Sequence, residues 1–390
     1  MQGQQGARAP GLPLAQCIQG QVDSRKWART QRKRRPRLGG SGQAPHLHSP
    51  QEYKAWSRTA PRHCYAPGLR TEARFPGLKP DAGHYESFFL RAARPSGGEG
   101  LWVRYTIDRA PGAAAVASFW ITWFDADAAP IAAKVSYAED RLAFPPGGYI
   151  AIADAGLTPG RAVGSIARDH GDLSWDLTFD DGAEAFDHLS HGWMYTRSFP
   201  RTKVRSPYPS TRFSGEVRLG GRTIELTGWP GMVGHNWGTE HAEQWVWIDA
   251  VGIDGANGFV DIAAGRVRVA GRLTPWIVNG VVEFDGKRHR LGGFSRTHTF
   301  HMKEGESGAV FTIPGAGIDV RGRVTARAGE IVTWPYDDPA GGIHTVRNSS
   351  IADLDLTVEQ TGETKSFSVY GSATYELGRL STPEGKRQTA

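Results

Sequence analysis

The sequence predicts a nearly all-β protein of two packed antiparallel barrels, on three observations. A chain of 390 residues is longer than one hydrophobic core usually serves, which favours two domains. Its 50 glycines and 24 prolines follow no collagen-like period, as expected of turns between many short strands. No stretch carries a convincing helical stripe beyond a turn or two near residues 52–59. Parallel α/β folds need helices between strands, so antiparallel barrels or sandwiches are favoured, and closed barrels also remove exposed edges.

Hydrophobic alternation with a period of two begins near residue 84. In the segment 101–108, for example, Leu101, Val103, Tyr105 and Ile107 share one face. On this criterion we expect strands at residues 84–91, 101–108, 118–125, 172–179, 213–219, 222–228, 245–251, 259–270, 275–284, 317–326, 330–335, 351–359 and 365–377.

The basic character of the chain belongs to its first 50 residues. They hold nine Lys or Arg and one acid, which leaves 37 basic and 39 acidic residues in the rest of the chain. We expect residues 1–50 to be a disordered basic tail, since they lack hydrophobic periodicity. We expect a first barrel over residues 51–240 and a second over 241–385. The Gly-rich stretch 228–234 is expected to interrupt the strands near this boundary, with residue 210 as the alternative position.

Composition argues against several classes of protein. A near-neutral body gives no reason to expect a nucleic-acid-binding fold. Cys17 and Cys64 are the only cysteines, so neither a disulfide framework nor a Cys-based metal site is expected. Arg34 and Arg35 are not followed by the apolar segment of an export signal, and the apolar run 113–124 is too short for a transmembrane helix. We therefore expect a cytoplasmic protein without a transmembrane segment, with peripheral membrane contact as an alternative.

The common catalytic signatures are missing from the sequence. It contains no Gly-x-Ser-x-Gly elbow, Walker loop or dinucleotide fingerprint. His235 and His241, combined with Glu240 or Glu243, match no standard zinc spacing, so no metal is expected. No cofactor is expected either.

The segment 243–249 carries the clearest chemical pattern. Alternation places Glu243, Trp245, Trp247 and Asp249 on one face. A carboxylic acid enclosed among indoles has its charged form disfavoured, which raises its pKa and suits a proton donor. Indole faces also stabilise a developing carbocation. The alternative is structural. The two acids would lie at solvent-exposed ends of the strand, paired with Arg or Lys, and the tryptophans would fill the core of a barrel.

The same region carries a resemblance to a known family. The stretch 231–252 reads GMVGHNWGTEHAEQWVWIDAVG. It resembles the signature of the carotenoid 1,2-hydratases, also called hydroxyneurosporene synthases, and of related lipocalin-like proteins such as tocopherol cyclases and decalin-forming Diels–Alderases. The matching residues are His235, Asn236, Trp237, Gly238, Trp245 and Trp247. Weaker matches at 84–91, 101–106 and 371–378 extend the resemblance over roughly residues 80–380.

The resemblance implies two lipocalin-like, or calycin-like, barrels with a ligand inside one of them or between them. It also implies an acid two residues before the Asn-Trp-Gly triplet, where this chain has Gly234. The chain therefore departs from the hydratase pattern at the position expected to protonate an alkene.

From these patterns we expect a cofactor-independent hydratase, cyclase or isomerase acting on an isoprenoid or polyene. If the chain is an enzyme, it is a hydro-lyase or an intramolecular cyclase. Glu243, Asp249 or Glu240 is the expected proton donor. His235 is expected to order the site, either as a proton donor or acceptor or by tying down the Gly-rich turn. The alternative is a non-catalytic carrier of a lipid or pigment, which Gly234 favours.

Six residues are expected to contact the substrate, which we take to be a small hydrophobic molecule: Trp245, Trp247, Trp237, Asn236, Glu86 and Arg104. Besides the structural alternative given above for Trp245 and Trp247, one stays open for three others. Trp237 can serve as a wedge in the core, and Glu86 can form an ion pair with Arg104 across neighbouring strands. The sequence does not fix the oligomeric state.

Overall fold

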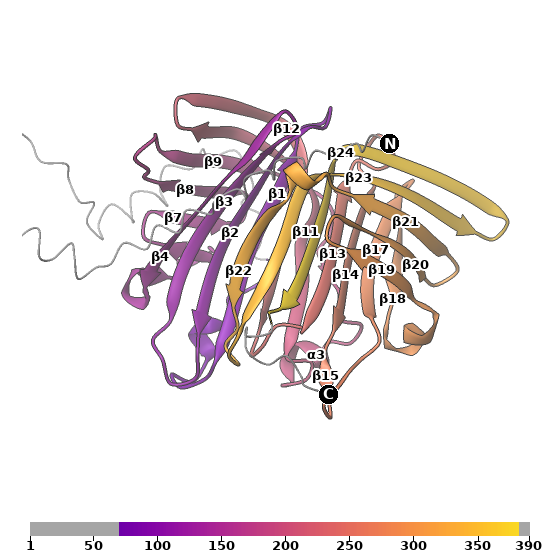
Figure 1. Ribbon diagram of the computed structural model, residues 1–390, viewed down its shortest axis with the longest axis horizontal. Helices are drawn as coiled ribbons and strands as arrows, with labels where there is room; N and C mark the ends of the chain where they lie inside the picture. The colour runs from indigo at the N-terminus through magenta and orange to yellow at the C-terminus, as the bar shows by residue number, and fades with distance from the viewer. Residues whose placement is uncertain (1–69, 382–390) are drawn as a thin grey trace, which may run out of the picture.

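Two antiparallel sheets, each curled around its own core, make up nearly all of the computed structural model, which describes residues 70–381 (Figure 1). The predicted fold class, two packed antiparallel barrels, is confirmed. The predicted disordered tail at residues 1–50 and the helical turn near 52–59 lie outside the described residues.

The first sheet has twelve strands in the order β4-β3-β2-β1-β12-β11-β9-β8-β7-β6-β5, with β10 paired to β11. Their bounds are β1 His84–Ala93, β2 Glu99–Arg109, β3 Val116–Asp125, β4 Ala128–Ala138, β5 Leu142–Ala143, β6 Ile150–Ile152, β7 Ala155–Thr158, β8 Arg161–Ile166, β9 Leu173–Phe179, β10 Phe186–Asp187, β11 Thr202–Leu219 and β12 Arg222–Gly238.

The second sheet has ten strands in the order β18-β17-β14-β13-β24-β23-β21-β20-β19, with β22 paired to β23. Their bounds are β13 Gln244–Val251, β14 Phe259–Arg266, β17 Ile277–Phe284, β18 Lys287–Gly292, β19 His301–Gly305, β20 Gly308–Pro314, β21 Asp319–Thr325, β22 Val332–Asp337, β23 Ile343–Gln360 and β24 Glu363–Leu380.

The remaining elements are short. Strands β15 (Arg268–Val269) and β16 (Arg272–Leu273) form a separate hairpin. The helices are the 3₁₀ turns η1 (Phe75–Gly77), η2 (Glu139–Arg141), η3 (Phe294–Thr299) and η4 (Ala328–Glu330), and the single α-helical turn α3 (Trp193–Thr196). Within residues 70–381, none of these helices has the length and apolar character needed to cross a membrane.

The predicted strands are present, but the interruption expected at residues 228–234 is wrong. Strand β12 runs through this stretch and pairs with β1, Gly231 opposite Ala92 and Val233 opposite Leu90. Gly228 has a positive φ of 62°, and β11 has register shifts opposite this region, so the strand bends and continues. Strands β4–β8, β10, β16 and β18–β20 had no expected counterpart, because they are very short or because small and charged residues weaken their alternation.

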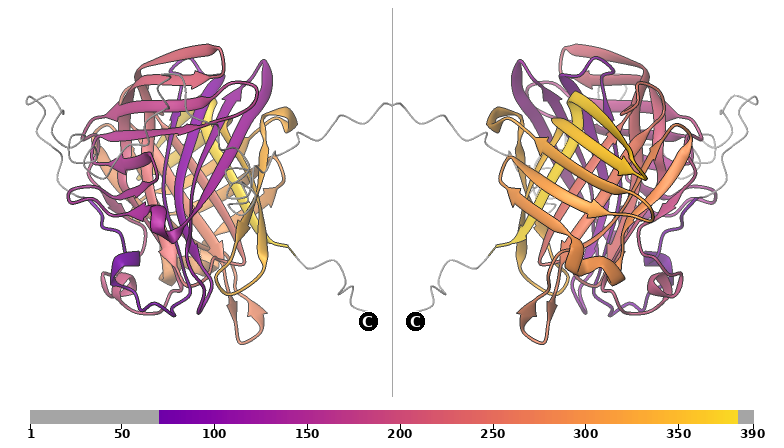
Figure 2. Two further views of the ribbon diagram at one scale, coloured as in Figure 1. Left: turned by 90° about the vertical axis from the view of Figure 1, so that its left-hand side faces the viewer. Right: turned by 90° about the vertical axis from the view of Figure 1, so that its right-hand side faces the viewer.

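The alternating faces of the strands are both used. In β2, the inward residues Leu101, Val103, Tyr105 and Ile107 lie in the core of the first barrel. The outward residues meet the second barrel in a smaller cluster, made of Trp102, Trp120, Phe124, Val332, Trp334, Tyr336, Val346 and Ile351. Every residue of β1 is buried for the same reason. The two barrels therefore pack face to face (Figure 1), and in each side view of Figure 2 one barrel lies in front of the other.

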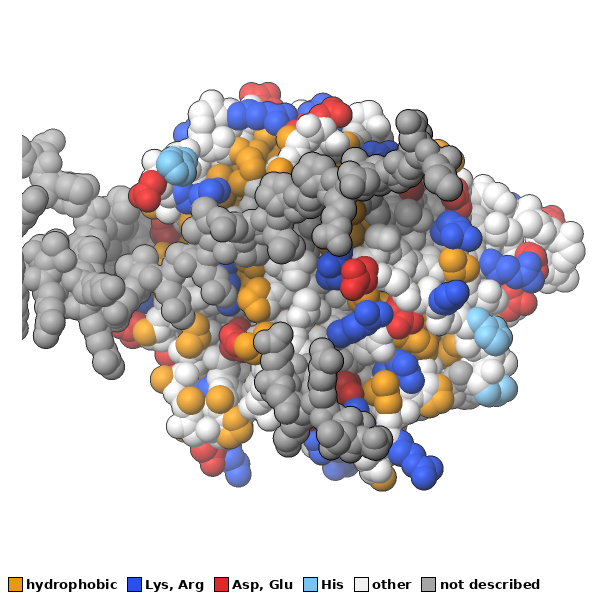
Figure 3. Space-filling model, in the orientation of Figure 1, with side chains coloured by type: hydrophobic (Ala, Val, Ile, Leu, Met, Phe, Trp, Pro, Cys, Tyr) orange, Lys and Arg blue, Asp and Glu red, His pale blue; other side chains and the backbone are white. Residues whose placement is uncertain are grey.

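The chain passes from the first sheet to the second between Gly238 and Gln244. Residue 240 lies in this link and residue 210 lies within β11, while the domain division itself stays a prediction. This link lies where the two barrels meet, and it forms part of the wall of the cavity described below. On the face shown in Figure 3, acidic and basic side chains are interspersed over both barrels, as expected of a near-neutral body.

Candidate functional site

A cavity of about 420 Å³ lies at the interface between the two barrels. Its walls come from β1, β2, β11 and β12 of the first sheet, from β13, β14, β17, β22 and β24 of the second, from the link 239–243, from the segment 188–201 before β11 and from the β15 hairpin. This volume lies within the range of about 300–1,000 Å³ that is usual for small-molecule sites. The lining is mainly apolar and aromatic, with a few buried polar groups that can orient a ligand.

Strand β13 places two indoles in this cavity. Val246, Ile248 and Ala250 point into the core of the second barrel, so Trp245 and Trp247 point toward the first barrel and line the cavity. The indole of Trp245 lies across Gly378, where an added Cβ would come within 2.2 Å of the ring. Glycine at this position is therefore what allows the indole its orientation.

Glu376 of β24 lies beside these indoles and faces the cavity. It pairs directly across the sheet with Trp247. Its Oε1 accepts a hydrogen bond of 2.8 Å from Trp245 Nε1, and its Oε2 accepts one of 3.1 Å from Asn348 Nδ2. Burial raises the pKa of Glu376, and the positive charge of Arg104 offsets only part of that rise. The structure thus encloses a carboxyl group with a stabilised neutral form in an aromatic site.

Arg104 and two phenols form the adjacent wall. The guanidinium of Arg104 lies 3.9 Å from the ring centroid of Tyr336, and its Nε donates a hydrogen bond of 2.6 Å to Ser87 Oγ. Tyr85 and Tyr336 are buried, and burial raises the pKa of both phenols out of the physiological range. These tyrosines stay neutral and can serve as hydrogen-bond donors.

Glu86 and Arg104 do not pair, because Glu86 is bound to His235 on the opposite face of β1. Glu86 Oε1 lies 2.8 Å from His235 Nε2, and His235 Nδ1 lies 2.7 Å from Thr71 Oγ1. Burial alone raises the pKa of Glu86, but the hydrogen bond from His235 and the nearby ring of His84, 3.5 Å away, lower it to about 2. This cluster lies outside the cavity lining, and Trp237 stacks on His235 with ring centroids 4.4 Å apart.

Asp249 is also buried outside the cavity lining, in an ion pair with Arg91. Burial raises the pKa of Asp249 to about 7, and Arg91 works in the opposite direction. Next to it, Asp261 accepts a hydrogen bond of 3.1 Å from Trp247 Nε1 and one of 2.5 Å from Ser206 Oγ. These contacts hold the indole of Trp247 in place from behind.

The two remaining predicted acids lie at the mouth of the cavity. Glu240 is in its lining and accepts a hydrogen bond of 2.8 Å from Arg201. Glu243 forms an ion pair with Arg268, with 2.7 Å between Arg268 Nε and the carboxylate. Both arginines belong to the lining, and both pairs are partly exposed to solvent.

Gly234 has a structural partner in Phe89. The two residues are opposite each other on β12 and β1, and a Cβ at position 234 would lie 2.1 Å from the Phe89 ring. Phe89 lines the cavity and meets Trp247 edge to face at 5.1 Å. An aromatic ring therefore occupies the space above the position where the hydratase pattern has an acid.

The structure brings half of the sequence-predicted residues together. Those that line the cavity are Arg104, Asn236, Glu240, Trp245 and Trp247. Those that do not are Glu86, His235, Trp237, Glu243 and Asp249. Among residues that were not predicted, the most informative are Glu376, Tyr336, Tyr85 and His241. Glu376 lies within the segment 371–378 noted above, so an acid in a strand of that segment was an available signal.

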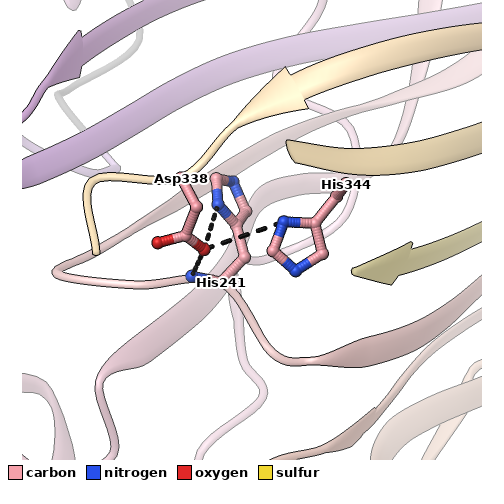
Figure 4. Close-up of side chains that lie close together, drawn as sticks. All are labelled: His241, Asp338 and His344. Atoms are coloured by element: carbon pink, nitrogen blue, oxygen red, sulfur yellow. Dashed lines mark hydrogen bonds and ion pairs between the residues drawn. The ribbon is translucent and has the colours of Figure 1, made fainter. Parts of the chain in front are cut away.

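His241 of the link meets two residues of the β22–β23 hairpin (Figure 4). Its Nδ1 lies 3.3 Å from Asp338 Oδ2, and the same oxygen lies 3.7 Å from His344 Nδ1. Within the described part of the chain, these three residues are the one group of His, Cys, Asp and Glu side chains with the spacing of a metal site. Of the three, only His241 lines the cavity.

Comparison with known proteins gives relatives at low identity. No family model matches the chain. It is 26% identical over 319 residues to an uncharacterised protein of Mycobacterium tuberculosis, found in strains CDC 1551 and H37Rv, with 80% of this chain and 91% of that protein covered.

Three solved structures are similar in shape. A Nitrosomonas europaea protein described as an AttH has a TM-score of 0.48 and 12% identity, over 80% of this chain and 98% of that one. Kievitone hydratase from Nectria haematococca has a TM-score of 0.48 and 9% identity, over 83% and 98%. CghA has a TM-score of 0.47 and 12% identity, over 81% and 93%.

Proposed function

We propose that the chain is a cofactor-independent enzyme that protonates a carbon–carbon double bond of a hydrophobic isoprenoid or polyene. The outcome is hydration, isomerisation or cyclisation in the cavity between the barrels. The observation that carries this proposal is the position of Glu376, a buried carboxyl group with a raised pKa that is hydrogen-bonded to Trp245, paired across the sheet with Trp247 and facing the cavity. A raised pKa suits a general acid, because a larger share of the carboxyl group keeps its proton at a given pH.

The first step transfers the proton of the Glu376 carboxyl group to one alkene carbon. A C–H bond forms with the π electrons, a carbocation is left on the neighbouring carbon, and Glu376 becomes a carboxylate. The faces of Trp245 and Trp247 stabilise the cation, an effect worth about 0.5–2 kcal/mol per ring. The Trp245 N–H and the Asn348 amide stabilise the carboxylate by remaining hydrogen-bonded to its two oxygens.

The cation then follows one of two courses. Water adds to it and returns a proton to Glu376, so the product gains one molecule of water. Alternatively, the Glu376 carboxylate removes a proton from a carbon adjacent to the cation, or a second double bond of the substrate first attacks the cation to close a ring and the carboxylate then removes a proton from a carbon adjacent to the new cation. In both cases the product is an isomer of the substrate. Both courses regenerate the acid, as a catalyst must. The second is favoured wherever the apolar walls exclude water.

A carrier of a lipid or pigment is the second candidate function. It is supported by Gly234 and Phe89, because an aromatic ring occupies the place of the acid in the hydratase pattern. The same cavity, with its indoles, would then hold a hydrophobic molecule without changing it.

The experiment that separates the two functions is mass spectrometry of small molecules extracted from the purified protein, before and after incubation with polyenes and prenylated precursors. A product heavier by one water, or an isomer separated by chromatography, supports the enzyme. A bound lipid recovered unchanged from every incubation contradicts the enzyme and supports the carrier.

A further inference from the structure

The group formed by His241, Asp338 and His344 has the geometry of a metal-binding site. A zinc ion holds nitrogen and oxygen ligands at about 2.0–2.1 Å, which at a tetrahedral angle puts two ligand atoms about 3.3 Å apart. The Nδ1 atoms of His241 and His344 lie 3.3 Å and 3.7 Å from Asp338 Oδ2, and one ligand atom from each residue lies within 4.8 Å of the others. Figure 4 shows both nitrogens facing this oxygen.

The two histidine rings also lack hydrogen-bond partners. All four ring nitrogens of His241 and His344 are buried, and none makes a well-aligned hydrogen bond to the described part of the protein. The exposed fractions of the side chains are 7% for His241, 2% for His344 and 5% for Asp338. The nitrogen nearest the carboxylate is within ion-pair range but is not aligned for a hydrogen bond. A buried polar atom without a partner costs about 1–3 kcal/mol, so two such rings call for a ligand.

The carboxylate is fixed in position by the backbone. Asp338 Oδ1 accepts a hydrogen bond of 2.8 Å from the N–H of Ala340, and Oδ2 accepts one of 2.9 Å from the N–H of His241. Each oxygen keeps a further lone pair. The ring of His241 is held by stacking on Tyr85, with centroids 3.8 Å apart, and on Trp245 at 5.7 Å. Metal sites are usually oriented by such outer contacts.

We propose that His241, Asp338 and His344 bind one divalent transition-metal ion, for which Zn²⁺ is the appropriate probe. Two imidazoles and one carboxylate suit ions of borderline softness, and three protein ligands leave at least one position for water. The ion would tie the link between the barrels to the turn between β22 and β23. By holding His241, which lines the cavity, the ion would fix one wall of that cavity. The proposal is independent of the proton transfer assigned to Glu376.

The test uses the untagged full-length chain, freed of metal with a chelator and titrated with Co²⁺ and then Zn²⁺. We expect one equivalent of Co²⁺ to give the visible absorption of a tetrahedral site and Zn²⁺ to displace it. Zn²⁺ should also raise the Tm. Replacing a residue that only contacts a metal ligand lowers metal affinity by about 10–100-fold. The variants His344→Gln and Asp338→Asn remove a ligand itself, so each should lower the affinity for Zn²⁺ by more than that. His289→Gln, which alters a partly buried histidine of β18, is the matched control.

Two results would overturn the metal site. One is the absence of a Co²⁺ spectrum and of a Zn²⁺-dependent Tm shift in folded wild-type protein. The other is equal metal affinity in His344→Gln and His289→Gln, which would place the ion elsewhere on the chain. Glu376→Gln should bind Zn²⁺ like the wild type, so failure of the proton-transfer proposal and failure of the metal site give different results.

Discussion

Replacing Glu376 with glutamine removes the proposed proton donor and keeps its shape. General-acid catalysis contributes about 10²–10⁴-fold to a rate, so we expect kcat to fall by that factor, equivalent to about 3–5.5 kcal/mol in the barrier. Because the volume and the apolar walls are unchanged, we expect the Kd for the ligand to change by less than about tenfold, the equivalent of one lost hydrogen bond.

The structure also predicts that Glu376→Gln folds. The amide oxygen can accept the hydrogen bond from Trp245 Nε1 in place of the carboxylate. The new NH₂ group would face Asn348, whose Oδ1 is buried and without a hydrogen-bond partner among the described residues. Rotation of the Asn348 amide by a half-turn then restores both hydrogen bonds. We therefore expect the free energy of unfolding to change by about 1 kcal/mol or less, because at most one hydrogen bond is lost.

The assay compares turnover, ligand binding and Tm in the wild type, in Glu376→Gln and in Glu363→Gln. Glu363 begins the same strand and is exposed, so its replacement controls for the loss of one carboxylate. Turnover in Glu376→Gln within about threefold of the wild type would refute the assignment of the proton donor, since general-acid catalysis contributes at least about 10²-fold. Loss of binding together with turnover would refute the claim that Glu376 acts on the chemical step.

Three other predictions concern the walls of the site and the buried ionic cluster. Gly378→Ala should displace the indole of Trp245, which lies 2.2 Å from the new Cβ, and weaken ligand binding by about tenfold or more in a titration of tryptophan fluorescence. Gly234→Asp should lower the Tm through its collision with Phe89, and adding Phe89→Ala should restore part of it. Glu86, with a pKa of about 2 against a usual 4.5, should contribute about 3 kcal/mol of stability at neutral pH, lost as the pH falls from about 4.5 toward 2 in urea unfolding.

Each of these predictions has its own control. Gly221→Ala adds a Cβ that meets nothing within 4 Å, so it should leave binding and Tm unchanged. Equal binding in Gly378→Ala and Gly221→Ala would contradict the role given to Trp245. A Gly234→Asp variant that is not rescued by Phe89→Ala would show that the clash is not the cause. Because the pKa of Glu86 is lowered in the folded state, the protein loses stability as the pH falls. If Glu86 is responsible, Glu86→Gln should flatten the pH dependence of the free energy of unfolding between pH 2 and 4.5.

Local alternation was sufficient to predict the barrels and the orientation of the β13 indoles. It showed that Trp245 and Trp247 share a face, because that depends only on the geometry of one strand. It could not show what packs against that face, because those residues belong to the first barrel and are distant in the sequence. For the same reason it placed Asp249 beside the indoles but could not show its partner Arg91, which is 158 positions away in the sequence.

The missed residues reach the site through long-range pairing. Glu376 is 131 positions from Trp245, and the two meet only because β24 pairs with β13 and Gly378 gives the indole room. His241, Asp338 and His344 come from a link and a hairpin whose contact depends on how the barrels pack. Such contacts have no periodic signature. An acid between two apolar residues, as Glu376 is between Tyr375 and Leu377, is a signal that the sequence does offer.

The most direct test of the proton transfer is incubation of the wild-type protein with polyene and prenylated substrates in D₂O, followed by mass spectrometry of the recovered molecules. Proton donation from Glu376, which exchanges with solvent, predicts a product with deuterium bonded to carbon and loss of that label in Glu376→Gln. Recovery of every bound molecule without carbon-bound deuterium would contradict the proposed enzyme and leave the cavity as the binding site of a carrier.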